Sequence, residues 1–264
     1  MSSKKGSIVV VSTGMTLGAH MTPRCRSYIE HADIVIGSNP PLVEQWLESI
    51  NPNYQSLQGL YAKGKHRADT YREMVDTMMA AVREGKNVVG AFYGHAGVFA
   101  WAPHRVVKEA RKEGYEAHME AGVSAEDCLY ADMGIDPGRV GSQHFETTQL
   151  MKYQRQIDPT AYLILWQVGL AGDTTVKRFS TGEAYRQVLV DLLSEHYPLE
   201  HQVAIYECPF TALDDMRIEW MALKNLPSAH VSLISTLVVP PSQKMVKNQT
   251  VLDKLAELDL QQEL

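Results

Sequence analysis

Residues 87–101, NVVGAFYGHAGVFAW, combine a buried strand with a loop suited to meeting a ligand. The first six residues are mostly apolar and rich in valine, which is typical of a buried strand. Gly94 and Gly97 follow, and glycine lets a ligand approach the main chain closely. Tyr93 and His95 lie beside them, where the strand would end. Because ligands of open α/β sheets bind at the carboxyl ends of the strands, we predict a ligand site here rather than an ordinary turn.

Strands and helices alternate along the first half of the chain, on both sides of this stretch. The expected strands lie at residues 7–12, 32–37, 54–57, 87–93 and 115–121. The expected helices lie at residues 23–31, 40–48, 67–84 and 102–113. Such alternation indicates a mostly parallel sheet with helices on both of its faces.

The helix expected at residues 67–84 has the clearest pattern, because its apolar residues recur three or four positions apart and share one face. Gly85 follows it, and glycine commonly ends helices. Arg67 and Tyr71 lie four positions apart in its first turns. Residues at that spacing are neighbours on a helix surface, so these two side chains can meet.

The second half of the chain opens with a junction at residues 122–141, where Asp127 follows Ser124 by three positions. That spacing predicts a capped helix start. The strands expected beyond it lie at residues 142–146, 161–168, 202–207 and 231–239, and the helices at residues 182–195 and 216–226. We therefore expect a two-lobed α/β fold: a mostly parallel sheet in residues 1–122, a mixed sheet in residues 123–240, and a polar tail in residues 241–264.

The composition argues against several classes of partner. A formal net charge of −6 disfavours nucleic acid, because phosphate binding requires a basic face. No stretch approaches the roughly 20 apolar residues of a membrane helix, and the N-terminus lacks the pattern of a signal peptide. The three cysteines have no close spacing and the ten histidines do not pair as HxxxH. We expect a cytoplasmic protein without disulfides or a metal site.

Three motifs together resemble one family of enzymes. They are YGHAGVF at residues 93–99, AWAPH at residues 100–104 and GVSAEDCLYADMGIDP at residues 122–137. The chain resembles the tetrapyrrole-methylase fold of class III S-adenosylmethionine-dependent methyltransferases, over about residues 6–240. Its first loop, STGMTLG, differs from the GxGPGD-like loop of most tetrapyrrole enzymes. That loop, YGHAG and HRADTY at residues 66–71 resemble the borosin branch, whose members methylate backbone amide nitrogens of a peptide.

The borosin resemblance implies a reaction centre of tyrosines and one arginine, matched by Tyr61, Arg67, Tyr71 and Tyr93. The nitrogen of an amide is a poor nucleophile because its lone pair is delocalised. Our hypothesis is that Tyr71, paired with Arg67, takes or relays the amide proton. Tyr61 and Tyr93 would then hold the amide oxygen and the sulfonium side, in the manner of an oxyanion hole. Which tyrosine acts as the base stays open.

The resemblance also implies S-adenosyl-L-methionine as the methyl donor, S-adenosyl-L-homocysteine as the product, and no metal. The matching cofactor positions are His95, Val98, Phe99, Ser124, Ala125, Gln167, Tyr206, Ser235 and Thr236. They come from both expected lobes, so the cofactor should lie in the cleft between them. Ser124 could instead serve only as a helix cap, and Gln167 only as a partner of the backbone.

The resemblance implies a homodimer as well. The tail ends in QQEL and holds no peptide rich in valine and isoleucine, so the split borosin type is expected. In that type the substrate is a separate precursor protein that is methylated in trans, here in a two-plus-two complex. Two alternatives are a tetrapyrrole C-methyltransferase of cobalamin or sirohaem synthesis, and an inactive protein that only docks a peptide. The absent GxGPGD loop argues against the first, and the complete set of tyrosines and arginine against the second.

Overall fold

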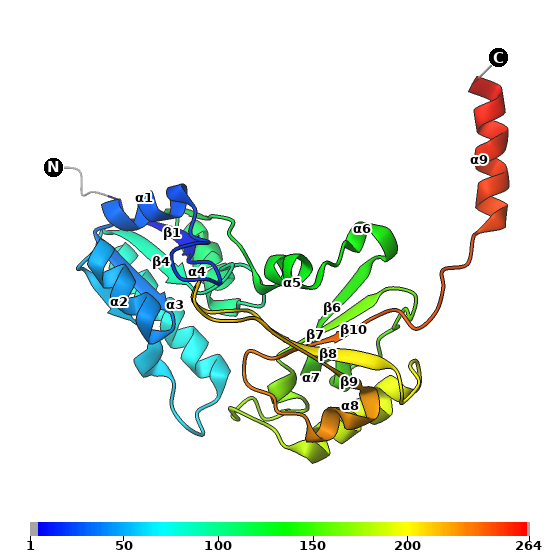
Figure 1. Cartoon of the computed structure of the whole chain (residues 1–264). Helices are drawn as coiled ribbons and strands as arrows, with labels where there is room; N and C mark the ends of the chain where they lie inside the picture. Colours follow the sequence, from blue (N-terminus) through cyan, green and yellow to red (C-terminus); the bar gives the residue numbers. More distant parts are fainter. Residues whose placement is uncertain (1–4, 263–264) are drawn as a thin grey trace.

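The computed structural model describes residues 5–262 as two lobes, each built around one five-stranded sheet (Figure 1). The strands of the N-terminal lobe are all parallel, in the order β3-β2-β4-β1-β5. Their bounds are β1 Ser7–Ser12, β2 Ile34–Ser38, β3 Tyr54–Ser56, β4 Asn87–Phe92 and β5 Glu116–Met119. The central strands β1 and β4 are nearly continuous in apolar residues because both of their faces are covered.

Two pairs of helices cover the two faces of this sheet. Their bounds are α1 Pro23–His31, α2 Pro41–Ile50, α3 Arg67–Arg83 and α4 Trp101–Lys112. Helices α1 and α2 pack on one face, where Ile29 and Leu47 contact the buried side chains of Val35 and Val89. Helices α3 and α4 pack on the other, where Met78 and Val106 join Ile8 and Val10. The predicted parallel sheet with flanking helices is confirmed.

The C-terminal lobe contains the predicted mixed sheet, in the order β6-β7-β10-β8-β9. Only β6 and β7 pair in parallel, and the other neighbours are antiparallel. The strands are β6 Ser142–Glu146, β7 Tyr162–Trp166, β8 Gln202–Glu207, β9 Arg217–Ala222 and β10 Thr236–Val239. The helices are α5 Ala125–Met133, α6 Pro137–Val140, α7 Thr147–Lys152 and α8 Glu183–Ser194, with short 3₁₀ turns η2 Val168–Leu170 and η3 Leu223–Ser228. The N-terminal lobe has one such turn, η1 Gln58–Leu60, after β3.

Two predictions for this lobe are wrong. The helix expected at residues 216–226 is the edge strand β9 followed by η3. All six residues of β9 pair with β8, so sheet pairing decides a segment whose apolar residues also fit a helix. The strand expected at residues 231–239 begins only at Thr236, and a loop precedes it. That loop leaves Leu233 and Ile234 half-exposed.

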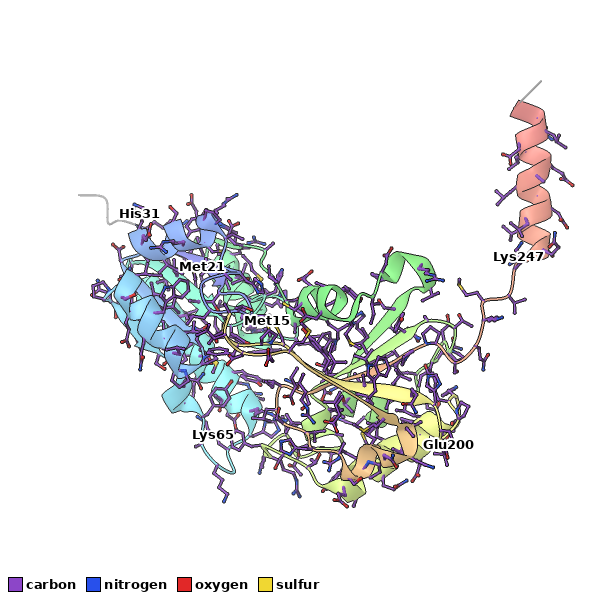
Figure 2. The ribbon with its side chains drawn as sticks, in the orientation of Figure 1. Met15, Met21, His31, Lys65, Glu200 and Lys247 are labelled. Carbon is purple, nitrogen blue, oxygen red and sulfur yellow. The ribbon has the colours of Figure 1, made fainter. Side chains whose placement is uncertain are left out.

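The chain ends in helix α9, Gln249–Gln262, which stands away from both lobes (Figure 1). Its side chains extend into the open beyond Lys247 (Figure 2), and they include the exposed apolar residues Val251, Leu252, Leu255 and Leu258. Much of the tail expected at residues 241–264 is therefore helical. No helix within residues 5–262 has both the length and the apolar character needed to cross a membrane.

The ends of β1 and β4 are joined where the two lobes meet. Gly14 and Gly94 exchange backbone hydrogen bonds of 3.1 and 3.0 Å just beyond these strands. Both glycines have positive φ, 76° and 68°, which residues with a side chain rarely adopt. Met15 follows Gly14 and packs with residues of the C-terminal lobe, at the junction seen in Figure 2. The loops after β1 and β4 are thereby fixed against the second lobe.

Candidate functional site

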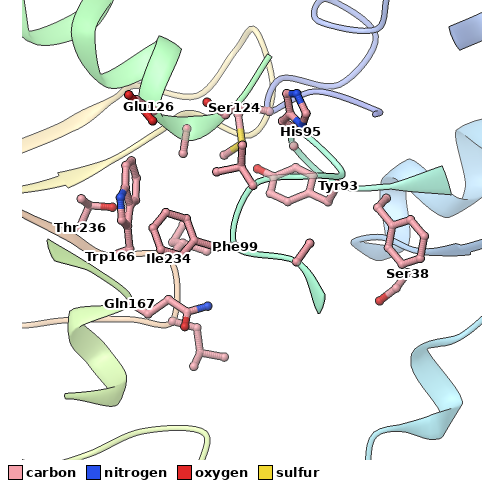
Figure 3. A pocket seen from close by; sticks show the side chains of 17 residues that line it. Ser38, Tyr93, His95, Phe99, Ser124, Glu126, Trp166, Gln167, Ile234 and Thr236 are labelled. Atoms are coloured by element: carbon pink, nitrogen blue, oxygen red, sulfur yellow. The ribbon is translucent and has the colours of Figure 1, made fainter. Parts of the chain in front are cut away.

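A cavity of about 330 Å³ lies between the two lobes (Figure 3). It is lined from the N-terminal lobe by the loop after β4, and from the C-terminal lobe by the start of α5, the end of β7 and the residues around the start of β10. The predicted site residues in its wall are Tyr93, His95, Val98, Phe99, Ser124, Ala125, Gln167 and Thr236. The predicted cleft position, at the carboxyl end of β4, is therefore where the structure places a cavity.

The loop after β4 is held in one conformation by hydrogen bonds that its backbone amides donate. The Ala96 amide donates to Ser12 Oγ at 3.0 Å, and the Gly97 amide donates to His95 Nδ1 at 2.9 Å. Val98 N donates to His95 O at 3.0 Å. Phe99 then has a φ of 50°, in the left-handed region that a phenylalanine seldom occupies. Such a conformation persists only where the surroundings impose it, and it turns the Phe99 ring toward the second lobe.

Trp166, the last residue of β7, forms the facing wall of the cavity. Its ring lies 5.7 Å from the ring of Phe99, and the two are adjacent in Figure 3. Trp166 Nε1 donates to His144 Nδ1 at 3.2 Å. Burial lowers the pKa of His144 and favours the neutral ring, which can accept that bond. The indole is therefore fixed in orientation, with Phe99 and Ile234 completing an apolar side of the cavity.

Ser124 is confirmed as a helix cap. Its Oγ accepts from Asp127 N at 3.4 Å, and Asp127 Oδ2 accepts from Ser124 N at 2.7 Å and from Ser124 Oγ at 2.8 Å. The hydroxyl is occupied in this capping box, so the part of α5 that faces the cavity is the first turn of the helix. The amides that begin this turn can donate to a ligand acceptor beside Glu126, which also lines the cavity.

Two of the predicted cofactor residues do not line the cavity. The Tyr206 hydroxyl is buried and donates to Asp132 Oδ2 at 2.7 Å. Ser235 is also buried, and its hydroxyl donates to Glu207. Burial opposes ionisation of Glu207, yet hydrogen bonds from Ser235 and Ser232 and the nearby Arg217 hold its pKa below its ordinary value. Tyr206 and Ser235 thus lie within the walls, and a direct role for either stays a prediction.

Several residues of the wall were missed from the sequence. They are Met15, Ser38, Glu126, Trp166, Leu233 and Ile234. Ser38 ends strand β2 of the parallel sheet, so the rule applied to Tyr93 would have found it. Trp166 lies inside the strand expected at residues 161–168, so that rule would not have selected it. Leu233 and Ile234 had no such signal, because the sequence places them inside an apolar run that reads as strand.

A second cavity of about 230 Å³ adjoins the first and shares Gln167 with it. Arg67 and Tyr71 line this second cavity, from the first turns of α3. Tyr61 lies close to both, because the Tyr71 hydroxyl and the charge of Arg67 each act on its pKa. Gln167, with a φ of 58°, lies between the cavities in a left-handed conformation. The structure thus brings Tyr61, Arg67 and Tyr71 together beside the first cavity, where Tyr93 lies.

The tyrosines Tyr61 and Tyr93 are held in the neutral form. Burial raises the pKa of Tyr61 to about 12, and the neighbouring Tyr71 adds to that rise. Burial likewise raises the pKa of Tyr93, with smaller contributions from Cys208 and Cys128. A neutral phenol donates a hydrogen bond, so both are suited to hold an oxygen on which negative charge develops. Within residues 5–262, no cluster of three or more His, Cys, Asp or Glu side chains could hold a metal ion.

Comparisons of the sequence and the fold with those of known proteins point to one family. The model of the tetrapyrrole (corrin/porphyrin) methylases matches residues 7–208. Among solved structures, uroporphyrin-III-C-methyltransferase from Thermus thermophilus superposes with a TM-score of 0.64 at 16% identity, covering 90% of this chain and 93% of that one. The cobalt precorrin-4 methyltransferase superposes with a TM-score of 0.65 at 15% identity, covering 89% and 94%. These likenesses confirm the predicted fold.

Curated relatives are more similar in sequence. The methyltransferase and type I borosin cyclic peptide precursor of Coprinopsis marcescibilis is 38% identical over 251 residues, 92% of this chain. The methyltransferase and omphalotin A precursor of Omphalotus olearius is 34% identical over 258 residues, 96% of this chain. The chain spans 64% and 62% of the lengths of these two relatives. With the family model matching most of its length and the cavity at the expected strand ends, the chain belongs to the tetrapyrrole (corrin/porphyrin) methylases.

Proposed function

We propose that the chain transfers methyl groups from S-adenosylmethionine to backbone amide nitrogens of a ribosomally made peptide. The observation that carries the proposal is the group of Tyr61, Arg67 and Tyr71 beside the inter-lobe cavity. The names of the relatives, which join a methyltransferase to a cyclic peptide precursor, support the same substrate class. A ring-carbon methylase would have no evident need for two phenols and a guanidinium at this point.

The residues of the first cavity fit S-adenosylmethionine. Phe99, Trp166 and Ile234 present an apolar wall suited to an adenine ring, and the amides that begin α5 suit a carboxylate. Gln167 and Thr236 add polar groups between these two regions. The bound cofactor supplies an electrophilic methyl group on a sulfonium, so methyl transfer requires in-line positioning of the amide nitrogen.

We place the peptide amide where the two cavities adjoin, with Tyr93 on the first, Tyr71 on the second and Tyr61 close to Tyr71. Tyr61 and Tyr93, as neutral phenols, donate to the amide oxygen and stabilise the charge that it gains when the nitrogen loses its proton. Tyr71, which lines the same cavity as Arg67, takes or relays that proton. One bond forms between nitrogen and methyl carbon, the bond from that carbon to sulfur breaks, and the proton leaves through Tyr71.

Mass spectrometry tests this function. The chain is incubated with S-adenosylmethionine and a synthetic peptide rich in valine and isoleucine, or with uroporphyrinogen III. We expect the peptide to gain mass in steps of about 14 Da, the mass added with each CH₂, with fragment ions that place each step on a backbone nitrogen. Methylation of the tetrapyrrole alone would support the C-methyltransferase instead, and binding of the peptide without methylation would support the inactive docking protein.

The assembly is part of the same proposal: a homodimer that binds a separate precursor protein in a two-plus-two complex. We expect analytical ultracentrifugation of the chain alone to report twice the mass of one chain. Adding a precursor protein that contains an apolar peptide should raise that mass by two precursor masses. A monomeric species at micromolar concentration, or a complex with one precursor for each dimer, would contradict this stoichiometry.

A further inference from the structure

Arg67 is held by a loop of the opposite lobe, residues 173–178, between η2 and α8. The Arg67 amide donates to Val176 O at 3.1 Å. Arg67 Nη1 donates to Arg178 O at 3.1 Å, and Nη2 donates to Asp173 Oδ2 at 3.3 Å. Three N–H groups of Arg67, in the N-terminal lobe, therefore donate hydrogen bonds to one short segment of the C-terminal lobe.

Asp173 is the centre of that loop. Its side chain is 1% exposed. Its Oδ1 accepts from Thr175 N at 3.1 Å and from Thr175 Oγ1 at 2.6 Å. Its Oδ2 accepts from Arg178 N at 3.1 Å as well as from Arg67. Burial opposes ionisation of Asp173, but these hydrogen bonds and the charge of Arg67 hold its pKa below the ordinary value, so the group is a carboxylate.

The backbone of this loop is unusual at the residue that meets Arg67. Val176 has a φ of 56°, a left-handed conformation that is rare for a β-branched residue. Among residues 5–262, the other non-glycine residues with positive φ are Phe99 and Gln167, and all three line one of the two cavities. Backbone strain concentrates at functional sites, where the surrounding structure maintains it.

We propose that Asp173 is a positioning residue for methyl transfer, which orients the Arg67 guanidinium toward Tyr71 only when the two lobes are in contact. Arg67, Tyr71, Asp173 and Val176 line the same cavity, so the carboxylate fixes a charge that acts directly beside the phenols. The proposal rests on the proposed function, because it assigns to Arg67 a part in the reaction.

Asp173→Asn is the sharpest change, because it keeps the size of the side chain. The amide oxygen can still accept from Thr175 in place of Oδ1. The amide NH₂ then takes the place of Oδ2, which accepted from Arg67 Nη2 and from Arg178 N. Because an NH₂ group can only donate, both of these hydrogen bonds are lost. Arg67 loses its charged partner and keeps its bonds to the carbonyls of Val176 and Arg178, while the loop keeps the turn at Thr175.

The matched control is Asp158→Asn. Asp158 Oδ1 accepts from Thr160 N at 2.8 Å and from Thr160 Oγ1 at 2.7 Å, the same turn that Asp173 forms with Thr175. Asp158 is exposed, and it lines neither cavity. A general effect of replacing the aspartate of such a turn would appear in both variants, whereas loss of Arg67 positioning would appear only at residue 173.

The kinetic test compares kcat with KM. We expect Asp173→Asn to lower kcat for peptide methylation about 10- to 100-fold, the effect of misplacing a reacting group by about 1 Å. The KM for the cofactor should change less than about twofold, and Asp158→Asn should leave both constants unchanged. In an Arg67→Ala background, Asp173→Asn should add nothing further. An unchanged kcat in Asp173→Asn would overturn the proposal. So would a double variant whose loss of kcat equals the product of the losses in the two single variants.

A second measurement does not depend on turnover. In ¹⁵N-arginine-labelled protein, the side-chain Nε signal that Arg67→Lys removes identifies Arg67. We expect that signal to be sharp in the native chain and in Asp158→Asn, and to broaden or vanish in Asp173→Asn. A signal that persists unchanged in Asp173→Asn overturns the positioning role even if no peptide is methylated. A different result would contradict the proposed function alone. In that case the native chain methylates no peptide, but the Arg67 signal is still lost in Asp173→Asn.

Thr175→Val keeps the test decisive if Asp173→Asn fails to fold. Valine matches the shape of threonine but removes the hydroxyl that donates to Asp173 Oδ1. We expect a fall in kcat of about threefold to tenfold, because loss of one hydrogen bond leaves the carboxylate less fixed. An unchanged kcat together with an unchanged Arg67 signal would overturn the proposal.

Discussion

Arg67→Ala and Tyr71→Phe are each expected to lower the rate of peptide methylation about 10²- to 10⁴-fold, the range that a positioned acid or base contributes. The first change removes the guanidinium that lines the cavity with Tyr71, and the second removes the hydroxyl to which we assign the proton transfer. Neither residue lines the first cavity, so the affinity for S-adenosylhomocysteine should stay within about twofold of the native value. Single-turnover methylation followed by mass spectrometry, with calorimetry of cofactor binding, measures both.

Two controls separate this effect from general damage to the fold. Arg72→Ala changes the residue next to Tyr71, an arginine whose side chain is 66% exposed and pairs with Asp69. Tyr153→Phe removes the hydroxyl of a half-exposed tyrosine that lines neither cavity. Both controls should methylate at the native rate. Native rates in Arg67→Ala and Tyr71→Phe as well would remove these residues from the reaction.

Ala125→Trp is expected to abolish cofactor binding. Ala125 begins α5 and lines the cavity of about 330 Å³, where an indole would occupy the space that the cofactor needs. We expect the dissociation constant for S-adenosylhomocysteine to rise at least about 100-fold, since overlap with a bulky side chain removes most contacts of the ligand. Calorimetry measures this directly, and methylation should fall in parallel.

Ala131→Trp is the matched control for that change. Ala131 lies in the same helix, six positions later, and is exposed. The same substitution there adds an indole to the surface and should leave cofactor affinity and melting temperature close to the native values. If Ala125→Trp bound the cofactor normally, the inter-lobe cavity would not be the cofactor site.

Local patterns were enough to place the N-terminal lobe. Its strands and helices follow from apolar runs and from spacings of three and four, which depend only on neighbours in the chain. The capping box of Ser124 and Asp127, and the shared helix face of Arg67 and Tyr71, were predictable for the same reason. The cavity after β4 lies where the rule for parallel sheets predicts a ligand site.

Local patterns could not predict segments whose structure depends on pairing with strands distant in the sequence. β9 has a pattern that fits a helix and a strand equally well, and its six pairs with β8 decide between them. The residues before Thr236 are as apolar as β10, yet they form a loop at the cavity. The hydroxyl of Ser235 bonds Glu207 in the wall, a contact that depends on how β8 and β10 meet.

By itself, the sequence determined the family, the succession of strands and helices along the first lobe, and the residue types that gather at its carboxyl edge. Only the tertiary structure decided that Asp173 meets Arg67, 106 positions away, and that Trp166 faces Phe99 across the cavity. The reason is physical: periodicity reports which face of an element is buried, whereas contacts between lobes depend on packing that no local spacing encodes.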